Sequence, residues 1–314
     1  MATPVFLIAG FLESGKTLFM SETLADPGFS NGMKTLLIVC EEGMEEYDLA
    51  ALSKVNTTVV TVESEEDFTE EFLNDCNKKY KPERVVIEYN GMWRMQKLYD
   101  MKLPRKWEIV QIITTVCAQT FQLYLNNMRS QVMEQFADAD MVIFNRCEAD
   151  TPKASYRRNV KAINPACEVY FENADGSPVM PDESLPYDLD SDVINIEDED
   201  YGIFYVDIMD APEKYEGKTV CFTGVVYKSE QLPKDYFVPG RFAMTCCADD
   251  IAFIGIPCRG DVILVNRLKK KDFVHVEAVV ECEYEPKEQR QVPILVAKKV
   301  SPGQEPKEKV VYFT

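Results

Sequence analysis

Short apolar runs rich in β-branched residues recur along the first half of the chain, and helix-compatible stretches separate several of them. The runs that we expect to form strands are 5–9, 35–39, 58–62, 84–87, 110–116, 141–144 and 168–171, and the clearest helical stretches are 18–24, 65–80 and 118–136. Nearly continuous hydrophobic strands that alternate with helices are typical of a parallel sheet covered on both faces. The pattern therefore predicts an α/β domain over residues 1–180.

The pattern changes after Asp175. Residues 181–200, "PDESLPYDLDSDVINIEDED", contain no Lys or Arg and many Asp and Glu. Such a segment repels itself and buries little surface, so we interpret 181–202 as an acidic linker, with a cation-attracting strip as the alternative.

Beyond the acidic segment, runs such as "KTVCFTGVVYKS" and "DFVHVEAVVECEYE" are separated by Gly, Pro and charged turns. They predict a small all-β domain over 203–314, a barrel or sandwich of about five or six strands without a clear helix.

Charge and composition narrow the classes of partner. The net charge of −19 argues against a nucleic-acid ligand, because phosphate binding needs a clustered basic face. No apolar run is long enough to span a membrane, and the N-terminus lacks the features of a secretory signal, so we expect no membrane insertion. The ten cysteines have no regular spacing, which favours free thiols in a reducing cytoplasm.

The segment "GFLESGKT", residues 10–17, has the Gly-x4-Gly-Lys-Thr spacing of a phosphate-binding loop between a predicted strand and a predicted helix. Its glycines let backbone N–H groups and a helix N-terminus converge on phosphate oxygens. Lys16 would neutralise the β- and γ-phosphates, and the Thr17 hydroxyl would hold Mg²⁺. The fold class expected is thus a P-loop NTPase sheet. The loop residues expected to bind nucleotide are Gly10, Glu13, Ser14, Gly15, Lys16, Thr17 and Leu18.

Acidic residues follow two of the other predicted strands. Glu41 and Glu42 stand in "VCEEGMEEYD", and Glu88 stands in "VVIEYNG", where Gly91 would let the next loop approach the γ-phosphate. We expect Glu88 to hold the metal's water shell, with a helix-capping acid as the alternative. Glu41 or Glu42 would orient the attacking water or hold the metal. The catalytic candidates are Lys16, Glu41, Glu42 and Glu88, and the Mg²⁺ candidates are Thr17, Glu41 and Glu88.

A third polar cluster, Asn145, Arg146 and Glu148 in "ADMVIFNRCEAD", resembles the Asn-Lys-x-Asp base-reading loop of GTPases. In such a loop the Asn fixes the loop, the aliphatic part of the basic residue lies on the purine, and the acid accepts from N1–H and the exocyclic amine of guanine. Here the basic residue is Arg and the acid is Glu, one methylene longer.

Taken in order, these segments resemble those of the CobW-like GTPases, a family of metal-insertion and metal-chaperone proteins. "GFLESGKT", "CEEGMEEYD", "IEYNG", "EQFADADMVIFNRCEAD" and "INPACEV" match successive family motifs over residues 4–176. The resemblance implies GTP with Mg²⁺ and maps the family's glutamate onto Glu41. The chain departs from the family in two respects. Where members carry a metal-binding Cys-x-Cys-Cys, it has "TTVVTVESEEDFTEEF", without cysteine, and Glu148 stands where the base-reading loop has Asp.

The C-terminal segment "GKTVCFTGVVYK…FVPGRFAMTCCADDIAFIGI" resembles the C-terminal region of YcgQ-type membrane proteins. The resemblance implies an OB-like barrel for this region, and the partner of the YcgQ-type proteins is a permease. It contains Cys246 and Cys247, with Cys258 after a predicted hairpin. Thiolates suit Zn²⁺ or Cu⁺, so these three cysteines are candidate Zn²⁺ ligands, with buried structural thiols as the alternative. The single histidine, His275, alternates with apolar neighbours, and we expect it on a strand's outer face without a role.

The function expected is GTP hydrolysis that switches the protein during the handling of zinc or cobalt/corrinoid, or during metallocofactor insertion. Hydrolysis would release loops ordered by the γ-phosphate and Mg²⁺. One alternative is an adaptor that senses nucleotide, barely hydrolyses it, and docks on a permease or metalloenzyme. Another is an ATP-using P-loop enzyme. The sequence leaves open whether the protein forms a homodimer.

Overall fold

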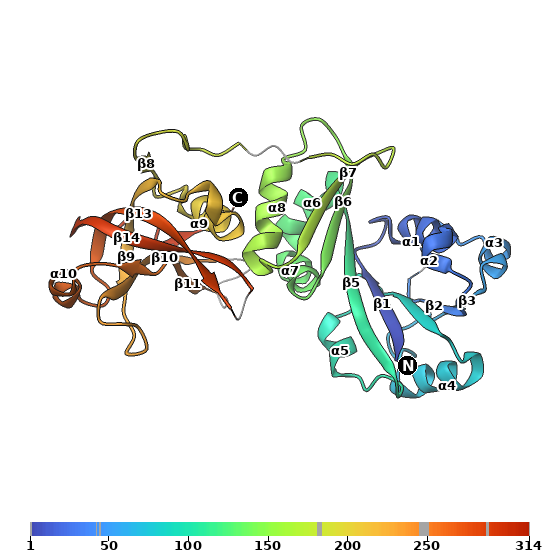
Figure 1. Ribbon diagram of the computed structural model, residues 1–314. Helices are drawn as coiled ribbons and strands as arrows, with labels where there is room; N and C mark the ends of the chain where they lie inside the picture. The colour runs from blue at the N-terminus through green and yellow to red at the C-terminus, as the bar shows by residue number, and fades with distance from the viewer. Residues whose placement is uncertain are drawn as a thin grey trace. The chain divides into compact units, whose positions relative to one another are not determined.

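The computed structural model describes residues 2–41, 43, 45–180, 184–244, 251–286 and 289–313. The chain divides into two compact units (Figure 1). The first contains Met1–Thr151 and Ala166–Pro181, and the second contains Pro152–Pro165 and Asp182–Thr314.

The first unit is built on a seven-stranded sheet in which all neighbouring strands are parallel. The strand order is β3-β2-β4-β1-β5-β6-β7. The strands are β1 (Thr3–Ala9), β2 (Thr35–Val39), β3 (Thr57–Thr61), β4 (Arg84–Glu88), β5 (Trp107–Cys117), β6 (Met141–Cys147) and β7 (Glu168–Asn173). Strands β2 and β4 are buried along their whole length, which explains their uninterrupted apolar runs. The predicted parallel sheet is confirmed.

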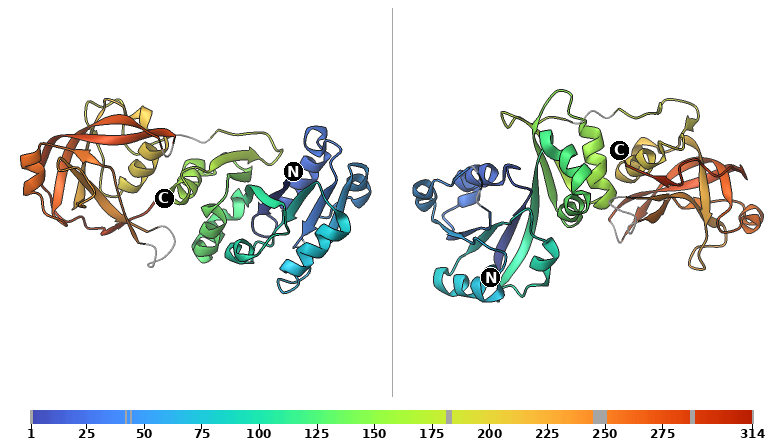
Figure 2. Two further views of the ribbon diagram at one scale, coloured as in Figure 1. Left: turned by 60° about the horizontal axis from the view of Figure 1, so that its bottom comes forward. Right: turned by 180° about the vertical axis from the view of Figure 1, so that it is seen from behind.

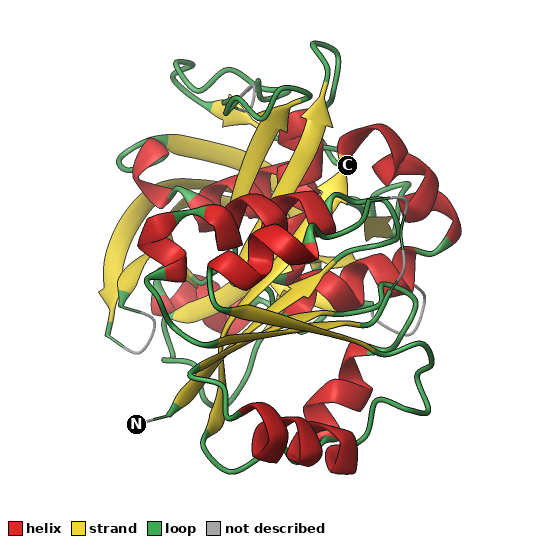
Figure 3. Ribbon diagram, turned by 90° about the vertical axis from the view of Figure 1, so that its right-hand side faces the viewer, coloured by secondary structure: helices red, strands yellow, loops and turns green. Residues whose placement is uncertain are grey.

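Helices cover both faces of this sheet (Figures 1 and 3). They are α1 (Lys16–Ala25), α2 (Pro27–Ser30), α3 (Leu49–Lys54), α4 (Glu70–Tyr80), α5 (Met95–Asp100), α6 (Ala118–Asn127) and α7 (Arg129–Ala137). Met20 of α1 and Leu52 of α3 pack in one core with Ile8 of β1. On the opposite face, Phe121 of α6 and Phe144 of β6 meet edge to face, with ring centroids 5.1 Å apart.

Two of the predicted helices differ from the observed ones. The stretch 65–80 becomes helical only at Glu70, because the Thr69 hydroxyl caps the helix by accepting a hydrogen bond from the Phe72 N–H. The stretch 118–136 forms two helices, α6 and α7, which are separated at Met128, where φ is −138°.

The second unit contains a closed ring of strands. The pairs β9–β10, β10–β12, β12–β14, β14–β13 and β13–β9 return to the starting strand, so these five strands form a small barrel (Figure 2). The barrel strands are β9 (Thr219–Tyr227), β10 (Tyr236–Ala243), β12 (Cys258–Arg259), β13 (Phe273–Glu285) and β14 (Arg290–Pro302). Ring closure with alternating inward and outward residues matches the predicted OB-like barrel.

Further elements surround the ring. They are α8 (Lys153–Ile163), β8 (Ile194–Asn195), α9 (Tyr201–Asp210), the 3₁₀ turn Pro212–Lys214, β11 (Ala252–Gly255), α10 (Val262–Arg267) and β15 (Val310–Val311). Helices α9 and α10 correct the prediction that this region lacks a clear helix. Helix α9 escaped recognition because its sequence, "YGIFYVDIMD", is apolar on most sides rather than on one stripe.

The acidic segment 181–202 contributes to the second unit over the residues described. Ile194 pairs in β8 with Val220 of β9, and both Ile194 and Ile196 lie in the core of this unit. Asn195 and Glu197, between and after them, are exposed. Alternation of this kind is a strand signal that the surrounding acidic residues had hidden. Among the described helices, none has the length and apolar character needed to cross a bilayer.

Candidate functional site

The loop between β1 and α1 has a tightly constrained backbone. Gly15, which precedes α1, has φ of +94°, a left-handed conformation that side chains rarely adopt. A Cβ atom on Gly15 would also stand 2.6 Å from the Asn145 side-chain nitrogen. The last loop residue is therefore required to be glycine, and the helix N-terminus that follows it exposes its backbone N–H groups.

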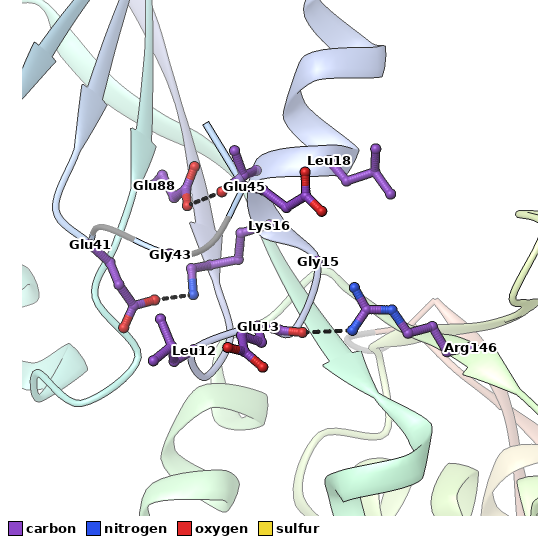
Figure 4. Close-up of a pocket in the computed structure, with 11 residues that line it drawn as sticks. Leu12, Glu13, Gly15, Lys16, Leu18, Glu41, Gly43, Glu45, Glu88 and Arg146 are labelled. Atoms are coloured by element: carbon purple, nitrogen blue, oxygen red, sulfur yellow. Dashed lines mark hydrogen bonds and ion pairs between the residues drawn. The ribbon is translucent and has the colours of Figure 1, made fainter. Parts of the chain in front are cut away.

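Side chains from β5 and β6 hold this loop in place. The Ser14 and Thr115 hydroxyls are hydrogen-bonded at 2.9 Å, and Asn145 Nδ2 donates to the Ser14 carbonyl at 2.7 Å. Arg146 Nη1 donates to the Glu13 carbonyl at 3.0 Å (Figure 4). In the part of the chain that the structure describes, the buried Asn145 Oδ1 has no hydrogen-bond partner. The loop is thus fixed from behind, and one buried acceptor stays available beside it.

Lys16 is buried under the loop. Its side chain is 3% exposed, and Nζ donates to the carbonyls of Gly10 at 2.8 Å and of Phe11 at 3.0 Å. It also forms an ion pair with Glu41, and the two side chains point toward one another (Figure 4). A buried cation is costly unless it is paired with an anion. Glu41 supplies that anion here, and a phosphate oxygen could pair with Lys16 in the same way.

Glu88 joins two elements at the end of β4. It is 2% exposed, and it accepts hydrogen bonds from the Thr17 hydroxyl at 2.9 Å and from the Tyr47 hydroxyl. Burial raises the pKa of the Glu88 carboxyl, while the Tyr47 hydrogen bond and the Lys16 charge limit that rise. The Thr17 hydroxyl and the carboxylates of Glu88 and Glu41 are hard oxygen donors, which fit Mg²⁺.

One pocket brings most of the predicted residues together. Its lining consists of Leu12, Glu13, Gly15, Lys16, Thr17, Leu18, Glu41, Gly43, Glu45, Glu88 and Arg146. Gly10, Ser14, Gly91 and Asn145 lie around the loop and outside the lining. Glu148 is exposed and accepts a hydrogen bond from Gln119 Nε2 at 2.6 Å. Glu42 lies outside the described residues.

The cysteine site predicted for the second unit has less support. Cys246 and Cys247 lie outside the described residues. Cys258 is fully buried in the barrel core, and burial raises the pKa of its thiol to about 12. Within the described ranges, no three His, Cys, Asp or Glu side chains are grouped to hold a metal. Cys258 is completely enclosed in the core, where no ion from solvent reaches its thiol, which argues against Cys258 as a zinc ligand.

Three residues of the site were not singled out in the sequence. Tyr47 holds Glu88, Thr115 holds Ser14, and Gln135 Nε2 donates to the Gly91 carbonyl at 2.9 Å. The neighbouring polar residues Thr114 and Thr115, near the carboxyl end of β5, were the available signal for Thr115. Tyr47 and Gln135 lie within the quoted segments "CEEGMEEYD" and "EQFADADMVIFNRCEAD", but only the folded chain brings them to their partners.

A family model for the CobW/HypB/UreG nucleotide-binding domain matches residues 4–171, more than half of the chain. The chain belongs to the CobW/HypB/UreG family. The match confirms the resemblance to CobW-like GTPases. A second model, the DUF1980 C-terminal domain, matches residues 174–313, which include the region that resembles YcgQ-type proteins. No curated protein matches the chain.

Two solved structures illustrate the similarity to family members. One is the hydrogenase maturation factor HypB from Archaeoglobus fulgidus, at 15% identity over 56% of this chain and 84% of that chain, with a TM-score of 0.42. The other is HypB from Helicobacter pylori in complex with nickel, at 14% identity over 55% of this chain and 80% of that chain, with a TM-score of 0.35.

The close approach of Gly91 to the phosphate loop can be tested directly. A Cβ atom at Gly91 would lie 2.2 Å from the Gly10 carbonyl oxygen and 2.6 Å from the Phe11 Cα. Because these are backbone atoms, Gly91→Ala must displace the loop, and we expect nucleotide affinity to fall at least about ten-fold, or 1.4 kcal/mol. The measurement is nucleotide binding by calorimetry.

The matched control is Gly43→Ala, since a Cβ there meets nothing closer than 3.9 Å. Equal affinities for the Gly91 variant and the unsubstituted protein would show that the loop does not depend on this approach.

Proposed function

We propose that this CobW/HypB/UreG family member binds GTP with Mg²⁺, hydrolyses it to GDP, and uses the nucleotide state as a switch in metal handling or metallocofactor insertion. The observation that carries the proposal is the ion pair between buried Lys16 and Glu41. An incoming phosphate must replace Glu41 on Lys16, and Glu41 begins the loop that reaches Tyr47. Nucleotide binding would thereby move a loop that also contacts Glu88.

Each residue of the site would have its own role in hydrolysis. Lys16 and the N-terminus of α1 would hold the β- and γ-phosphates, and Arg146 and Asn145 would keep the loop in shape. Thr17 and Glu88 would hold Mg²⁺, and the ion would supply positive charge that offsets the charge of the phosphates. Glu41, once released from Lys16, would orient water or complete the metal's ligand shell. Catalysis of this kind consists of positioning and charge stabilisation.

The proposal also concerns which metal the protein handles and which client protein it serves. Zinc or a cobalt/corrinoid species would be handled, and the client would be a permease or a metalloenzyme engaged through the second unit. The nickel bound by Helicobacter pylori HypB supports metal handling as a class of function within the family. The eight cysteines described as free thiols support a reducing compartment such as the cytoplasm.

Removing the buried cation tests the enzymatic part. Lys16→Ala is expected to lower the single-turnover rate of GTP hydrolysis at least about 10²-fold, because one charged donor to the transferred phosphate is lost. The rate is measured with enzyme in excess and with Mg²⁺ present. If the unsubstituted protein shows no single-turnover hydrolysis, the adaptor hypothesis replaces the enzymatic one.

Glu41 as a competitor for Lys16 gives a second test. Glu41→Gln weakens the ion pair that a phosphate must replace, so we expect it to tighten GTP binding about ten-fold without Mg²⁺. It should slow Mg²⁺-dependent hydrolysis if Glu41 later serves water or metal. The control is Glu45→Gln, which removes a carboxylate from the same lining and leaves the Lys16–Glu41 pair intact. Unchanged or weaker Mg²⁺-free binding in Glu41→Gln would contradict the displacement.

Base selectivity depends on Glu148. If its carboxylate accepts from the guanine edge, GTP should bind at least about ten-fold more tightly than ATP, and Glu148→Gln should remove most of that preference. Asp150→Asn, at another exposed acid of the same loop, should retain it. Calorimetric affinities for both nucleotides provide the measurement. Equal affinities in the unsubstituted protein would favour the ATP-using alternative.

A further inference from the structure

The single histidine of the chain lies against a cysteine thiol on the outside of the barrel. Cys221 of β9 and His275 of β13 belong to neighbouring antiparallel strands, and Cys221 Sγ is 3.1 Å from His275 Nε2. Cys221 lies diagonally across from His275, because the register pairs Cys221 with Glu277 and Thr223 with His275. Side chains on one face of a sheet reach such diagonal neighbours.

Strand alternation separates this thiol from the barrel core. Val220 and Phe222, on either side of Cys221 in the sequence, are core residues, as is Val276 beside His275. Cys221 and His275 therefore face outward. His275 is exposed, whereas Cys221 is 9% exposed beneath its neighbours. A small ion from solvent can reach the pair from the imidazole side.

The other nitrogen of the imidazole is also engaged. His275 Nδ1 is 3.2 Å from the Thr223 hydroxyl oxygen. With the proton on Nδ1, the ring donates to Thr223 and turns the Nε2 lone pair toward the thiol. Histidine ligands of metals are commonly held in this way, by a hydrogen bond from the nitrogen that does not bind the metal. His275 is thus oriented, and its free lone pair faces sulfur.

We propose that Cys221 and His275 form an open binding site for Zn²⁺ or a similar thiophilic cation. A thiolate and a neutral imidazole are ligands that zinc prefers. In a tetrahedral site with Zn–S of about 2.3 Å and Zn–N of about 2.0–2.1 Å, the two ligand atoms lie about 3.5 Å apart. The observed pair needs to separate by only a few tenths of an ångström, which the exposed imidazole allows.

The site has two protein ligands and leaves the remaining positions of the metal to exchangeable groups. On binding, the Cys221 S–H bond breaks, its proton goes to solvent, and a sulfur–metal bond forms without any change of oxidation state. Burial and Glu277 raise the pKa of this thiol, so binding near neutral pH releases close to one proton. Incomplete coordination suits a cation that is passed on rather than stored.

The physiological meaning of this site rests on the metal handling proposed above, but the site itself is independent of nucleotide hydrolysis. It also differs in place from the cysteine site predicted from the sequence, since Cys258 is a core residue and Cys221 faces outward.

Co²⁺ titration of the nucleotide-free full chain tests the proposal. Cobalt replaces zinc in such sites, and a cobalt–thiolate bond gives a near-ultraviolet charge-transfer band that the oxygen ligands at Thr17 and Glu88 cannot give. We expect this band to saturate near one equivalent and to disappear when Zn²⁺ is added. Cys221→Ser should abolish it. His275→Gln, at an exposed position that leaves the fold intact, should weaken binding at least about ten-fold.

Three further variants sharpen the outcome. Thr223→Val removes the partner of Nδ1 and should weaken binding about ten-fold while keeping the band, as a positioning residue does. Cys282→Ser removes a partly exposed cysteine of β13, the strand that carries His275, and should change neither the band nor the affinity for Co²⁺. Lys16→Ala should keep the band and lose hydrolysis, which separates this site from the nucleotide site.

A band that persists in Cys221→Ser overturns the proposal. A band that is lost only in the double variant Cys246→Ser and Cys247→Ser also overturns it, and assigns the metal to that cysteine pair instead.

Discussion

The buried ammonium group of Lys16 is the constraint on which the nucleotide site depends. Two loop carbonyls and the Glu41 carboxylate compensate for its lost hydration. Breaking a buried ion pair without a substitute costs about 3–5 kcal/mol, so Glu41 leaves only when another anion takes its place. In the proposed function, the same charge would therefore bind phosphate and connect the presence of phosphate to the position of the chain after β2.

Glu88 extends this arrangement to the other side of the site. Its two carboxylate oxygens are held by Thr17 at the start of α1 and by Tyr47 in the loop before α3. A carboxyl that is buried and held by two hydroxyls has little freedom to rotate. A cation taken up by Thr17 and Glu88 would change both contacts at once. In the proposed function, Lys16 and Glu88 would thus connect the same loop to the phosphates and to the metal ion of a bound nucleotide.

The second unit illustrates how strand alternation assigns chemistry to a face. Cys258 is directed into the barrel core, whereas Cys221 lies on the outer face of its strand beside His275. Two cysteines in apolar runs of similar appearance therefore have opposite surroundings.

The strands of the parallel sheet, the phosphate loop, and the acids after β2 and at the end of β4 could be predicted from the sequence, because they rest on local periodicity and spacing. The split of residues 118–136 into two helices and the helix α9 could not, since propensity does not reveal where a chain packs. The contacts of Tyr47, Thr115 and Gln135 and the Cys221–His275 pair could not be predicted either. Each depends on strands or loops that are distant in sequence and adjacent in space. Local chemistry was determined by the sequence alone, whereas its partners were decided by the tertiary structure, because hydrogen bonds and ion pairs require distances that only packing fixes.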